Sequence, residues 1–271
     1  MVWAGEIGDG YKMLFEVYEK IYESKNLQKI EIFRTKFGKM LLIDGCIQLI
    51  EKFEKTYHEM LVHVPMFTHS NPRKVLIIGG GDGCTLREVL KHNPEKVVMV
   101  EIDKEVIEAC KKYLKLDNGS FENEKVEIII KDGISYVENC KEKFDVLIVD
   151  GTDPNPTSMS LFSREFFLSC SNITDIFCMQ SQSPAFQEKL IKTIVKNTSF
   201  FKNRAFYISC IPMYPFGIWS FLIASNKLEV RPNYNELRTK FANKRIETEH
   251  YTPELHVSAF NLPKWIAKLL T

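Results

Sequence analysis

Short apolar runs alternate with helical patterns along the chain after Pro72. Each run is rich in β-branched residues and is bounded by turn residues, as buried strands are. Between the runs, apolar residues recur at helical spacing over about 85–92, 104–114 and 134–140. This order predicts an α/β fold with a mostly parallel, doubly wound sheet, whose first four strands are residues 75–78, 97–100, 126–130 and 146–149.

The rest of the pattern sets the domain organisation. Apolar and polar positions alternate from about residue 26 to 51, and Asp44-Gly45 between two runs is the signature of a β-hairpin. A helix is predicted over 56–67. We therefore predict a small β-strand and hairpin domain over residues 1–55 and a Rossmann-like domain over residues 56–271. Its later elements are strands at 175–179, 205–211 and 219–224 and helices at 184–196, near Glu236 and near Pro263.

Composition argues against several classes of protein. The 271 residues include 36 basic and 35 acidic side chains, a balance that favours neither nucleic acid nor an anionic membrane as a partner. No segment has the length and apolarity of a membrane span. The seven cysteines include no C-x-x-C pair, and His58 and His63, five residues apart on a helix, cannot share one zinc ion in the usual way. We expect a cytoplasmic protein with buried thiols and no metal site.

Five carboxylates give the strongest functional signal. Each lies at or just past the carboxyl end of a predicted strand: Asp82, Glu101, Asp132, Asp150 and Asp153. In a parallel sheet these ends meet at one edge, where the ligand crevice lies. Because so much negative charge gathers there, we expect a cationic ligand.

The loop after the first strand surrounds Asp82 with four glycines, Gly79, Gly80, Gly81 and Gly83. Glycines there let a ligand approach the backbone closely, although a tight structural turn would need them as well. Glu101 ends the next strand, the usual place for an acid that accepts both hydroxyls of a ribose. A nucleoside therefore fits, whereas Asp82 would disfavour a pyrophosphate.

Asp132 and Gly133 follow the third strand. Asp132 would either accept from an adenine amino group or cap the next helix. Together the three loops predict a pocket for an S-adenosyl compound, as in Rossmann-like methyltransferases. Asp82 would repel the carboxylate of S-adenosylmethionine, but it would pair with the bare ammonium of the decarboxylated form. We therefore predict decarboxylated S-adenosylmethionine as cosubstrate, with no prosthetic group.

Asp150 and Asp153 follow the fourth strand, where a second substrate would meet the first. A diamine would match them, although an Asx turn before Pro154 would also use an aspartate. An ammonium group must lose a proton before it attacks carbon. We therefore assign Asp150 as the catalytic base and Asp153 as the residue that holds the same nitrogen.

Several segments carry a resemblance to a known family: residues 42–48 (LIDGCIQ), 57–60 (YHEM), 75–89 (VLIIGGGDGCTLREV), 100–103 (VEID), 150–154 (DGTDP), 211–215 (IPMYP) and 251–256 (YTPELH). With these motifs in order along nearly the whole chain, the protein resembles spermidine synthase, the polyamine aminopropyltransferase family. The resemblance implies a β domain followed by a Rossmann-like domain. It also implies homodimers or homotetramers formed through the N-terminal part.

The resemblance also implies roles for individual residues. Those expected around decarboxylated S-adenosylmethionine are Gln28, Asp82, Glu101, Asp132 and Gly133. Those expected to face the amine acceptor are Tyr57, Asp150, Asp153, Tyr214 and Trp219. The aromatic rings of this second set would lie against the alkyl chain and the cationic head.

Three positions depart from the family pattern. Residues 155–158 read Asn-Pro-Thr-Ser where the family usually has a G-P-A element that borders the adenine. Gln182 stands where many members have Glu, and Cys84 replaces a common glycine. We expect the first departure to affect the adenine contacts, the second to affect the choice of acceptor, and Cys84 to be tolerated.

The predicted reaction transfers the aminopropyl group of decarboxylated S-adenosylmethionine to putrescine and gives spermidine and methylthioadenosine. One alternative is a putrescine N-methyltransferase that uses S-adenosylmethionine on the same scaffold. Another is a polyamine-binding protein without catalysis. The acceptor could also be cadaverine, agmatine or spermidine, because pocket depth rather than a motif measures chain length.

Overall fold

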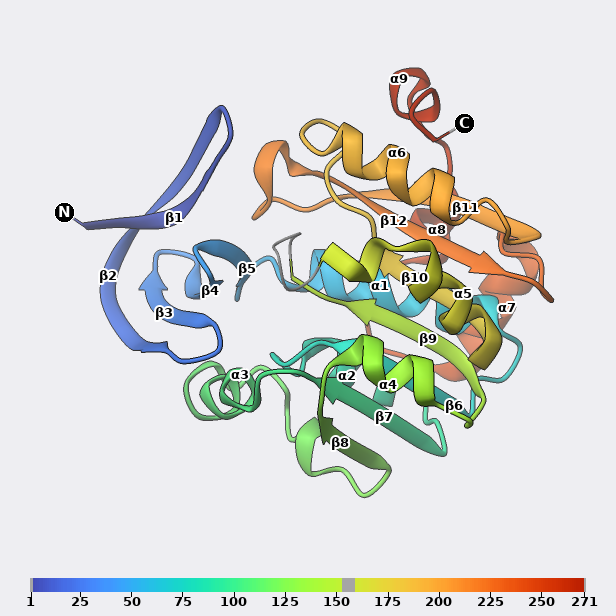
Figure 1. Ribbon diagram of the computed structural model, residues 1–271, viewed down its shortest axis with the longest axis horizontal. Helices are drawn as coiled ribbons and strands as arrows, with labels where there is room; N and C mark the ends of the chain where they lie inside the picture. Colours follow the sequence, from blue (N-terminus) through green and yellow to red (C-terminus); the bar gives the residue numbers. More distant parts are fainter. Residues whose placement is uncertain (1, 153–158, 271) are drawn as a thin grey trace.

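The computed structural model describes residues 2–152 and 159–270 and contains two β-sheets (Figure 1). The N-terminal sheet is antiparallel throughout, in the order β1-β2-β3-β4-β5. The predicted hairpin is confirmed, because Asp44 and Gly45 both have positive φ, 51° and 81°, as the tightest hairpin turn requires. The strands are β1 Val2–Gly8, β2 Tyr11–Lys25, β3 Lys29–Thr35, β4 Gly38–Ile43 and β5 Cys46–Ile50.

The larger sheet has the order β11-β12-β10-β9-β6-β7-β8. Strands β6 to β10 pair in parallel, while β12 runs antiparallel to both β10 and β11. The predicted mostly parallel sheet is confirmed. The chain order reverses between β6 and β9, which is where open α/β sheets bind their ligands. The strands are β6 Lys74–Gly79, β7 Lys96–Glu101, β8 Val126–Ile130, β9 Phe144–Asp150, β10 Thr174–Gln180, β11 Asn203–Cys210 and β12 Ile218–Ser225.

Helices cover both faces of this sheet (Figure 1). On β6, Val75 and Ile77 join one apolar core, and Leu76 and Ile78 join the other. Because both faces are buried, these strands read as unbroken apolar runs. The first core contains residues of α1 Lys55–Thr68, α2 Cys84–Leu90, α3 Lys104–Ala109, α7 Tyr234–Lys244 and α8 Pro253–Ala259. The second contains residues of α4 Gly133–Asn139, α5 Arg164–Ile173 and α6 Glu188–Asn197, and the short α9 Lys264–Ala267 lies near the end of the chain.

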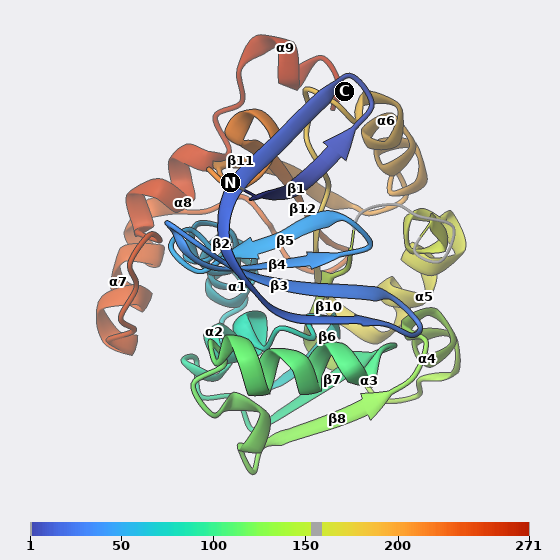
Figure 2. The ribbon, with the colours of Figure 1, turned by 90° about the vertical axis from the view of Figure 1, so that its left-hand side faces the viewer.

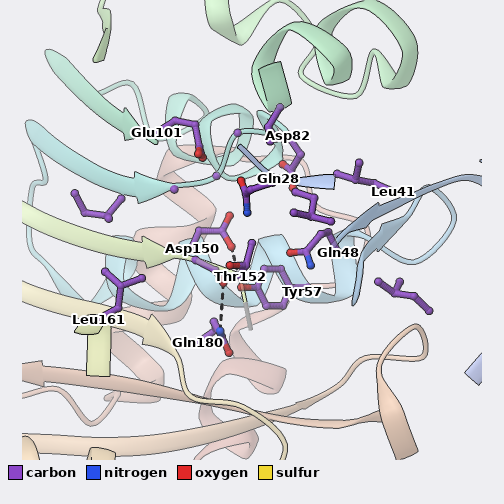
Figure 3. Close-up of a pocket in the computed structure, with 18 of the residues that line it drawn as sticks. Gln28, Leu41, Gln48, Tyr57, Asp82, Glu101, Asp150, Thr152, Leu161 and Gln180 are labelled. Carbon is purple, nitrogen blue, oxygen red and sulfur yellow. Dashed lines mark hydrogen bonds between the residues drawn. The ribbon is translucent and has the colours of Figure 1, made fainter. Parts of the chain in front are cut away.

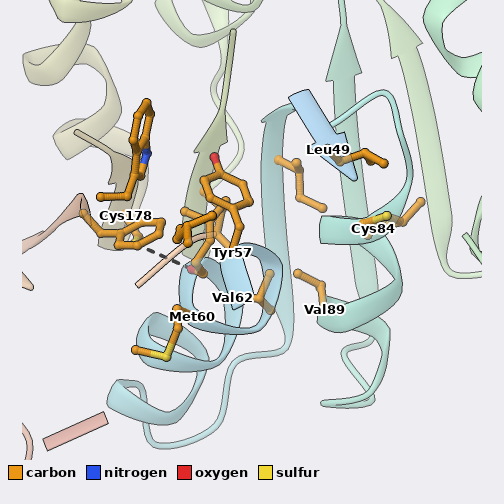
Figure 4. Packing of buried hydrophobic residues seen from close by; sticks show 14 of the residues in the cluster. Leu49, Tyr57, Met60, Val62, Cys84, Val89 and Cys178 are labelled. Carbon is orange, nitrogen blue, oxygen red and sulfur yellow. Dashed lines mark hydrogen bonds between the residues drawn. The ribbon is translucent and has the colours of Figure 1, made fainter. Parts of the chain in front are cut away.

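The first core also joins the two sheets. Leu49 of β5 belongs to the same cluster of buried side chains as Tyr57 and Val62 of α1 and Cys84 of α2 (Figure 4). Helix α1 therefore holds the N-terminal sheet beside the larger one. Figures 1 and 2 show the N-terminal sheet facing the carboxyl ends of β6, β7 and β9.

Polar side chains define where several helices begin. Asp103 accepts a hydrogen bond from the N–H of Glu105 and caps α3. The other side-chain caps are Asp132 on α4, Ser163 on α5, Asn233 on α7 and Thr252 on α8. Helix α2 begins differently, at Gly83 with φ +82°, where an added Cβ would lie 2.6 Å from the ring of Phe121.

The structure corrects several expectations from the sequence. Strands β1 and β2 and helix α5 had not been predicted. The helix expected over 104–114 is α-helical only to Ala109 and then widens into a π turn. Cys210 is exposed and Cys46 and Cys140 are half-buried, so the expectation of buried thiols holds for the other four cysteines.

Two further points concern the domain boundary and the membrane. Strand β5 ends at Ile50 and α1 begins at Lys55, and the proposed division at residue 55 stays a prediction. Among the described residues, no helix combines the length and the apolarity that a membrane crossing needs.

Candidate active site

A pocket lies at the carboxyl ends of β6, β7 and β9, and side chains from the N-terminal sheet close its other side. Figure 3 shows Glu101 and Asp150 at the ends of β7 and β9 and Asp82 in the loop after β6, together with Gln28 and Gln48 of the N-terminal part. Most of the side chains singled out in the sequence line it, namely Gln28, Tyr57, Gly79, Gly80, Gly81, Asp82, Glu101, Asp132, Gly133, Asp150, Tyr214 and Trp219. Gly83 lies behind the wall, at the start of α2, and Asp153 lies outside the described residues.

The glycine loop brings the acidic strand ends together. Gly79 has φ +84°, and an added Cβ would lie 2.2 Å from the carbonyl oxygen of Asp150. The N–H of Gly80 donates to that carbonyl at 2.9 Å. At Gly81, an added Cβ would lie 2.9 Å from a carboxylate oxygen of Glu101. Here the glycines serve close packing between strands as well as access for a ligand.

Asp150 is held by two hydroxyl groups at the end of β9. Tyr57 Oη donates to its Oδ1 at 2.8 Å, and Thr85 Oγ1 donates to its Oδ2 at 2.6 Å. Burial raises the pKa of Asp150, the Asp82 carboxylate raises it further, and His58 and the two hydrogen bonds offset part of the rise. A carboxylate with a raised pKa is a better proton acceptor than an ordinary one.

Aromatic rings form the wall beside Asp150. The Tyr57 and Tyr214 rings meet edge to face with centroids 5.6 Å apart, and the Tyr214 and Trp219 centroids are 4.4 Å apart. Tyr214 Oη donates to the carbonyl of Gln48 at 2.8 Å, and Trp219 Nε1 donates to Gln180 Oε1 at 3.2 Å. The Tyr214 hydroxyl and the Trp219 N–H are thus hydrogen-bonded within the protein. The faces and edges of the rings remain for contact with an alkyl chain or a cationic head.

Asp82 does not carry its charge alone, because the imidazole of His58 lies beside it. The spacing of His58 from His63 had argued only against a zinc site. His58 Nε2 is 3.6 Å from Asp82 Oδ2, and the N–H of Cys84 donates to Asp82 Oδ1 at 2.7 Å. Burial by itself raises the pKa of Asp82. His58 and the N–H of Cys84 together lower it by more, so the pKa lies below its usual range. Burial likewise opposes the charge on His58, but Asp82 and Glu54 hold the pKa of His58 well above 6.5.

Glu101 ends β7 and is almost completely buried. Its Oε1 accepts from the N–H of Asp103 at 3.0 Å. Burial raises the pKa of Glu101 to about 7, although backbone N–H groups offset part of the rise. Its charge is therefore gained or lost close to neutral pH.

The remaining cosubstrate candidates come from separate elements. Gln28 reaches the pocket from the turn between β2 and β3. Asp132 accepts from the N–H of Ser135 at 2.8 Å, so the helix-cap alternative is present, and the residue lines the pocket as well. Gly133 packs on Ile78, where an added Cβ would lie 2.4 Å from a methyl group.

One acid on the pocket wall was not predicted from the sequence. Glu6 of β1 is 5% exposed, accepts from the N–H of Ile47 at 3.2 Å and accepts from the hydroxyl of Tyr11. Gln182, expected to affect the acceptor, is fully buried and lies outside the pocket lining. Gln180 lines the pocket in its place and donates to the carbonyl of Gly151 at 3.3 Å.

Two groups of side chains in the described ranges are close enough together to hold an ion, Glu54 with His58 and Cys84, and His69 with Asp145 and Asp175. In the first, Glu54 already pairs with Arg87, and burial holds the pKa of the Cys84 thiol well above its usual range, which disfavours the thiolate that a metal needs. In the second, Asp175 pairs with Lys227. We assign neither group to a metal.

The sheet order, the glycine loop and the acid at the end of β7 define the class of Rossmann-like, nucleoside-dependent enzymes. Comparison with known families narrows this class. Residues 2–51 match the spermidine synthase tetramerisation domain, and residues 54–234 match the spermine/spermidine synthase domain.

Individual relatives are similar to this chain over most or nearly all of its length. The polyamine aminopropyltransferase of Archaeoglobus fulgidus is 48% identical over 269 residues, which are 99% of this chain and 98% of the relative. That of Methanocaldococcus jannaschii is 45% identical and covers 88% of this chain and 83% of its own. Spermidine synthase from Thermotoga maritima superposes with a TM-score of 0.92, at 36% identity, over 99% of this chain and 93% of its own. A spermidine synthase in complex with the transition-state analogue AdoDATO gives 0.93, also at 36% identity, over 99% and 94%. The chain therefore belongs to the spermidine synthase family and is a polyamine aminopropyltransferase.

The pKa of Glu101 gives a first prediction. The ionised carboxylate can accept from two ribose hydroxyls with both of its oxygens, whereas protonation turns one oxygen into a donor, so nucleoside binding should weaken as the pH falls through about 7. By calorimetry, methylthioadenosine should bind on the order of tenfold more weakly at about pH 6 than at about pH 8. This probe has no ammonium group, so Asp82 and Asp150 contribute little. Glu101→Gln should bind weakly at both pH values, and an equally steep profile in that variant would contradict the assignment.

Proposed function

We propose that the enzyme transfers the aminopropyl group of decarboxylated S-adenosylmethionine to putrescine and releases spermidine and methylthioadenosine. The observation that carries this proposal is that Asp82, Glu101 and Asp150 line one pocket, with Asp150 between Glu101 and the ring of Tyr57 (Figure 3). Such a pocket suits two cations that react with each other. The similarity to a spermidine synthase bound to a transition-state analogue supports the proposal.

The donor's nucleoside would lie against Glu101, Gln28, Asp132 and Gly133, and its ammonium would bind Asp82. The side chain of Asp82 is 12% exposed, whereas that of His58 is 1% exposed. A ligand therefore meets more of the carboxylate than of the imidazole, although His58 also lines the pocket. For this reason Asp82 would still disfavour the carboxylate of S-adenosylmethionine, even though His58 balances its charge.

The acceptor would lie along Tyr57, Tyr214 and Trp219, with one nitrogen at Asp150. We also assign Asp153 to this nitrogen from the sequence alone. Glu6 is placed to receive the distal ammonium, because it is the acid that the N-terminal sheet contributes to the pocket wall. A diamine would then have a carboxylate at each end and aromatic faces along its chain.

In the proposed reaction, the acceptor ammonium gives a proton to Asp150, and the neutral amine attacks the carbon next to sulfur. The new C–N bond forms as the C–S bond breaks, and the electron pair of the broken bond goes to the sulfonium, which leaves as a neutral thioether. Because the sulfonium is already activated, the protein has to align the two substrates and accept one proton.

A homo-oligomer is a further part of the proposal. Several large apolar side chains on β1 and β2 are exposed, namely Val2, Trp3, Ile7, Leu14 and Tyr18. Figure 1 shows this strand pair projecting from the rest of the molecule. Exposed apolar patches of this kind mark protein interfaces, and the segment matches the family's tetramerisation domain. We propose a homodimer or homotetramer formed through this strand pair.

A mass-spectrometric screen tests the proposed reaction and its rival. The protein is incubated with decarboxylated S-adenosylmethionine or S-adenosylmethionine and with putrescine, cadaverine, agmatine or spermidine, and products are ranked by kcat/KM. The proposal expects aminopropyl addition, fastest to putrescine. Methyl addition from S-adenosylmethionine would instead identify a putrescine N-methyltransferase, and binding without any product would identify a polyamine-binding protein.

Asp150→Asn tests the proposed base. The amide cannot accept the acceptor's proton, so kcat should fall on the order of 10²–10⁴-fold. Binding of methylthioadenosine, measured by calorimetry, should remain within about twofold, since the nucleoside lies on the Glu101 side. Unchanged turnover in this variant would show that another group takes the proton.

Glu6→Gln tests the proposed site for the distal ammonium. Loss of one charged hydrogen bond should raise the KM for putrescine on the order of tenfold and leave the donor KM unchanged. Butylamine is the matched acceptor, because it has the same carbon chain and no distal ammonium. Its kcat/KM should be equal in the wild type and the variant, and an equal loss for both amines would rule out this role for Glu6.

A further inference from the structure

A chain of buried ion pairs runs from the pocket into the space between α1 and α2. His58 Nδ1 lies 2.8 Å from Glu54 Oε2, and Arg87 Nη2 donates to both oxygens of Glu54 at 3.0 Å. Arg87 Nε donates to Glu88 Oε1 at 2.8 Å, and Arg87 Nη1 donates to the carbonyl of Leu116 at 2.7 Å. The aminopropyl transfer described above uses none of these groups directly. Burial of so many charges is unfavourable unless each is paired, so their arrangement calls for a reason.

The two nitrogens of His58 face two different carboxylates. Nδ1 faces a carboxylate oxygen of Glu54 at 2.8 Å and the backbone carbonyl of Glu54 at 2.9 Å, and Nε2 faces Asp82 at 3.6 Å. A neutral imidazole has one N–H and one lone pair, so it would direct a lone pair at one of these carboxylates. Only the imidazolium presents a proton to both. The geometry itself therefore selects the charged form of His58.

Glu54 is held in place independently of the pocket. It lies at the start of α1, 1% exposed, and Arg87 fixes both of its oxygens. Arg87 is in turn anchored by Glu88, whose other oxygen binds His63 at 3.1 Å and Lys91 at 2.7 Å. The position of Glu54 is thus set by the packing of α1 on α2 and not by the ligand.

We propose that Glu54, anchored by Arg87, is a positioning residue that keeps His58 as an imidazolium and so keeps Asp82 ionised and oriented toward the donor's ammonium. This inference rests on the proposed function in assigning Asp82 to that ammonium. If Glu54 lost its charge, the cationic Arg87 would remain on the far side of Glu54 without a carboxylate between it and His58, and this would favour loss of the imidazolium proton. His58 would then present a lone pair to Asp82, and Asp82 would have to turn away or take a proton.

The charged and titratable groups around His58 come from four segments. Glu54 precedes α1 and Tyr57 lies in it, Asp82 lies in the glycine loop, Cys84 and Arg87 lie in α2, and Asp150, whose charge also interacts with His58, ends β9. Arg87 reaches His58 only through Glu54 in the hydrogen bonds described. Replacing Glu54 by Gln therefore removes the carboxylate that links His58 to Arg87 and leaves the backbone carbonyl of Glu54 beside Nδ1.

Glu54→Gln is the test variant, and Glu88→Gln is its matched control. Both remove a buried carboxylate from Arg87 and should destabilise the fold to a similar degree, but only Glu54 contacts His58. In the wild type, the donor KM should rise below about pH 7, where Glu101 takes a proton, and again at alkaline pH, where His58 loses one. In Glu54→Gln the alkaline rise should move down by about one to two pH units, so that the donor KM at about pH 8 is on the order of tenfold higher than in the wild type and falls again toward pH 7. Glu88→Gln should keep the wild-type profile.

The charge of His58 can be read without any substrate. In protein labelled with ¹⁵N-histidine, the wild type should show His58 protonated on both nitrogens at about pH 8, with the signals assigned from a His58→Asn variant. Glu54→Gln should show the neutral form at that pH. If Glu54→Gln does not fold, the paired variant E54Q/R87Q removes both charges together and should show the same shift. A neutral His58 in the wild type, or the same profile in the Glu54 and Glu88 variants, would overturn the proposal. Absence of turnover with decarboxylated S-adenosylmethionine in the wild type would overturn the proposed function instead.

Discussion

Two carboxylates with opposite pKa shifts share one buried pocket, and the chemistry depends on the difference between them. Asp82 has an imidazole and a backbone N–H beside it, and these partners hold its pKa low. Asp150 has two neutral hydroxyl donors, and burial and Asp82 raise its pKa. Two neighbouring acids whose pKa values are shifted in opposite directions can take different roles. In our account Asp82 remains an anion that receives a fixed charge, and Asp150 remains a base that accepts a proton.

The protein interior and the bound substrates would together balance the negative charge of this pocket. His58 balances Asp82 from behind, while the sulfonium and ammonium groups of two cationic substrates would balance the remaining acids from the front. A site of this kind binds cations well only while its carboxylates are ionised. The ion pairs between α1 and α2 then belong to the binding site, although they lie behind its wall.

The sequence was sufficient for the parallel sheet, because strands buried on both faces leave unbroken apolar runs such as 75–78 and 146–149. It was insufficient for β1 and β2, whose exposed apolar residues follow no period of two. Helix α5 could have been found: Phe166, Cys170 and Ile173 are buried at helical spacing after the cap Ser163. The antiparallel pairing of β11 and β12 also depends on contacts that no local pattern contains.

For the site, sheet topology explains which residues could be predicted from the sequence and which could not. Asp82, Glu101 and Asp150 follow parallel strands, so their convergence on one pocket could be predicted from the sheet alone. Glu6 comes from another sheet, and nothing in its local sequence marks it. His58 had a usable signal, because Glu54 lies four residues before it, but the helix had been predicted to begin only at residue 56. The actual start at Lys55 brings this pair onto one face.

The central claim is that Asp82 selects the donor by charge. Calorimetry with decarboxylated S-adenosylmethionine and S-adenosylmethionine, on the wild type and on Asp82→Asn, measures this selection as a ratio of dissociation constants. The account predicts a wild-type preference for the decarboxylated donor of about 100-fold or more, which falls to within about tenfold in the variant because the like-charge repulsion is gone. An unchanged ratio in Asp82→Asn, or equal affinity for both compounds in the wild type, would contradict it.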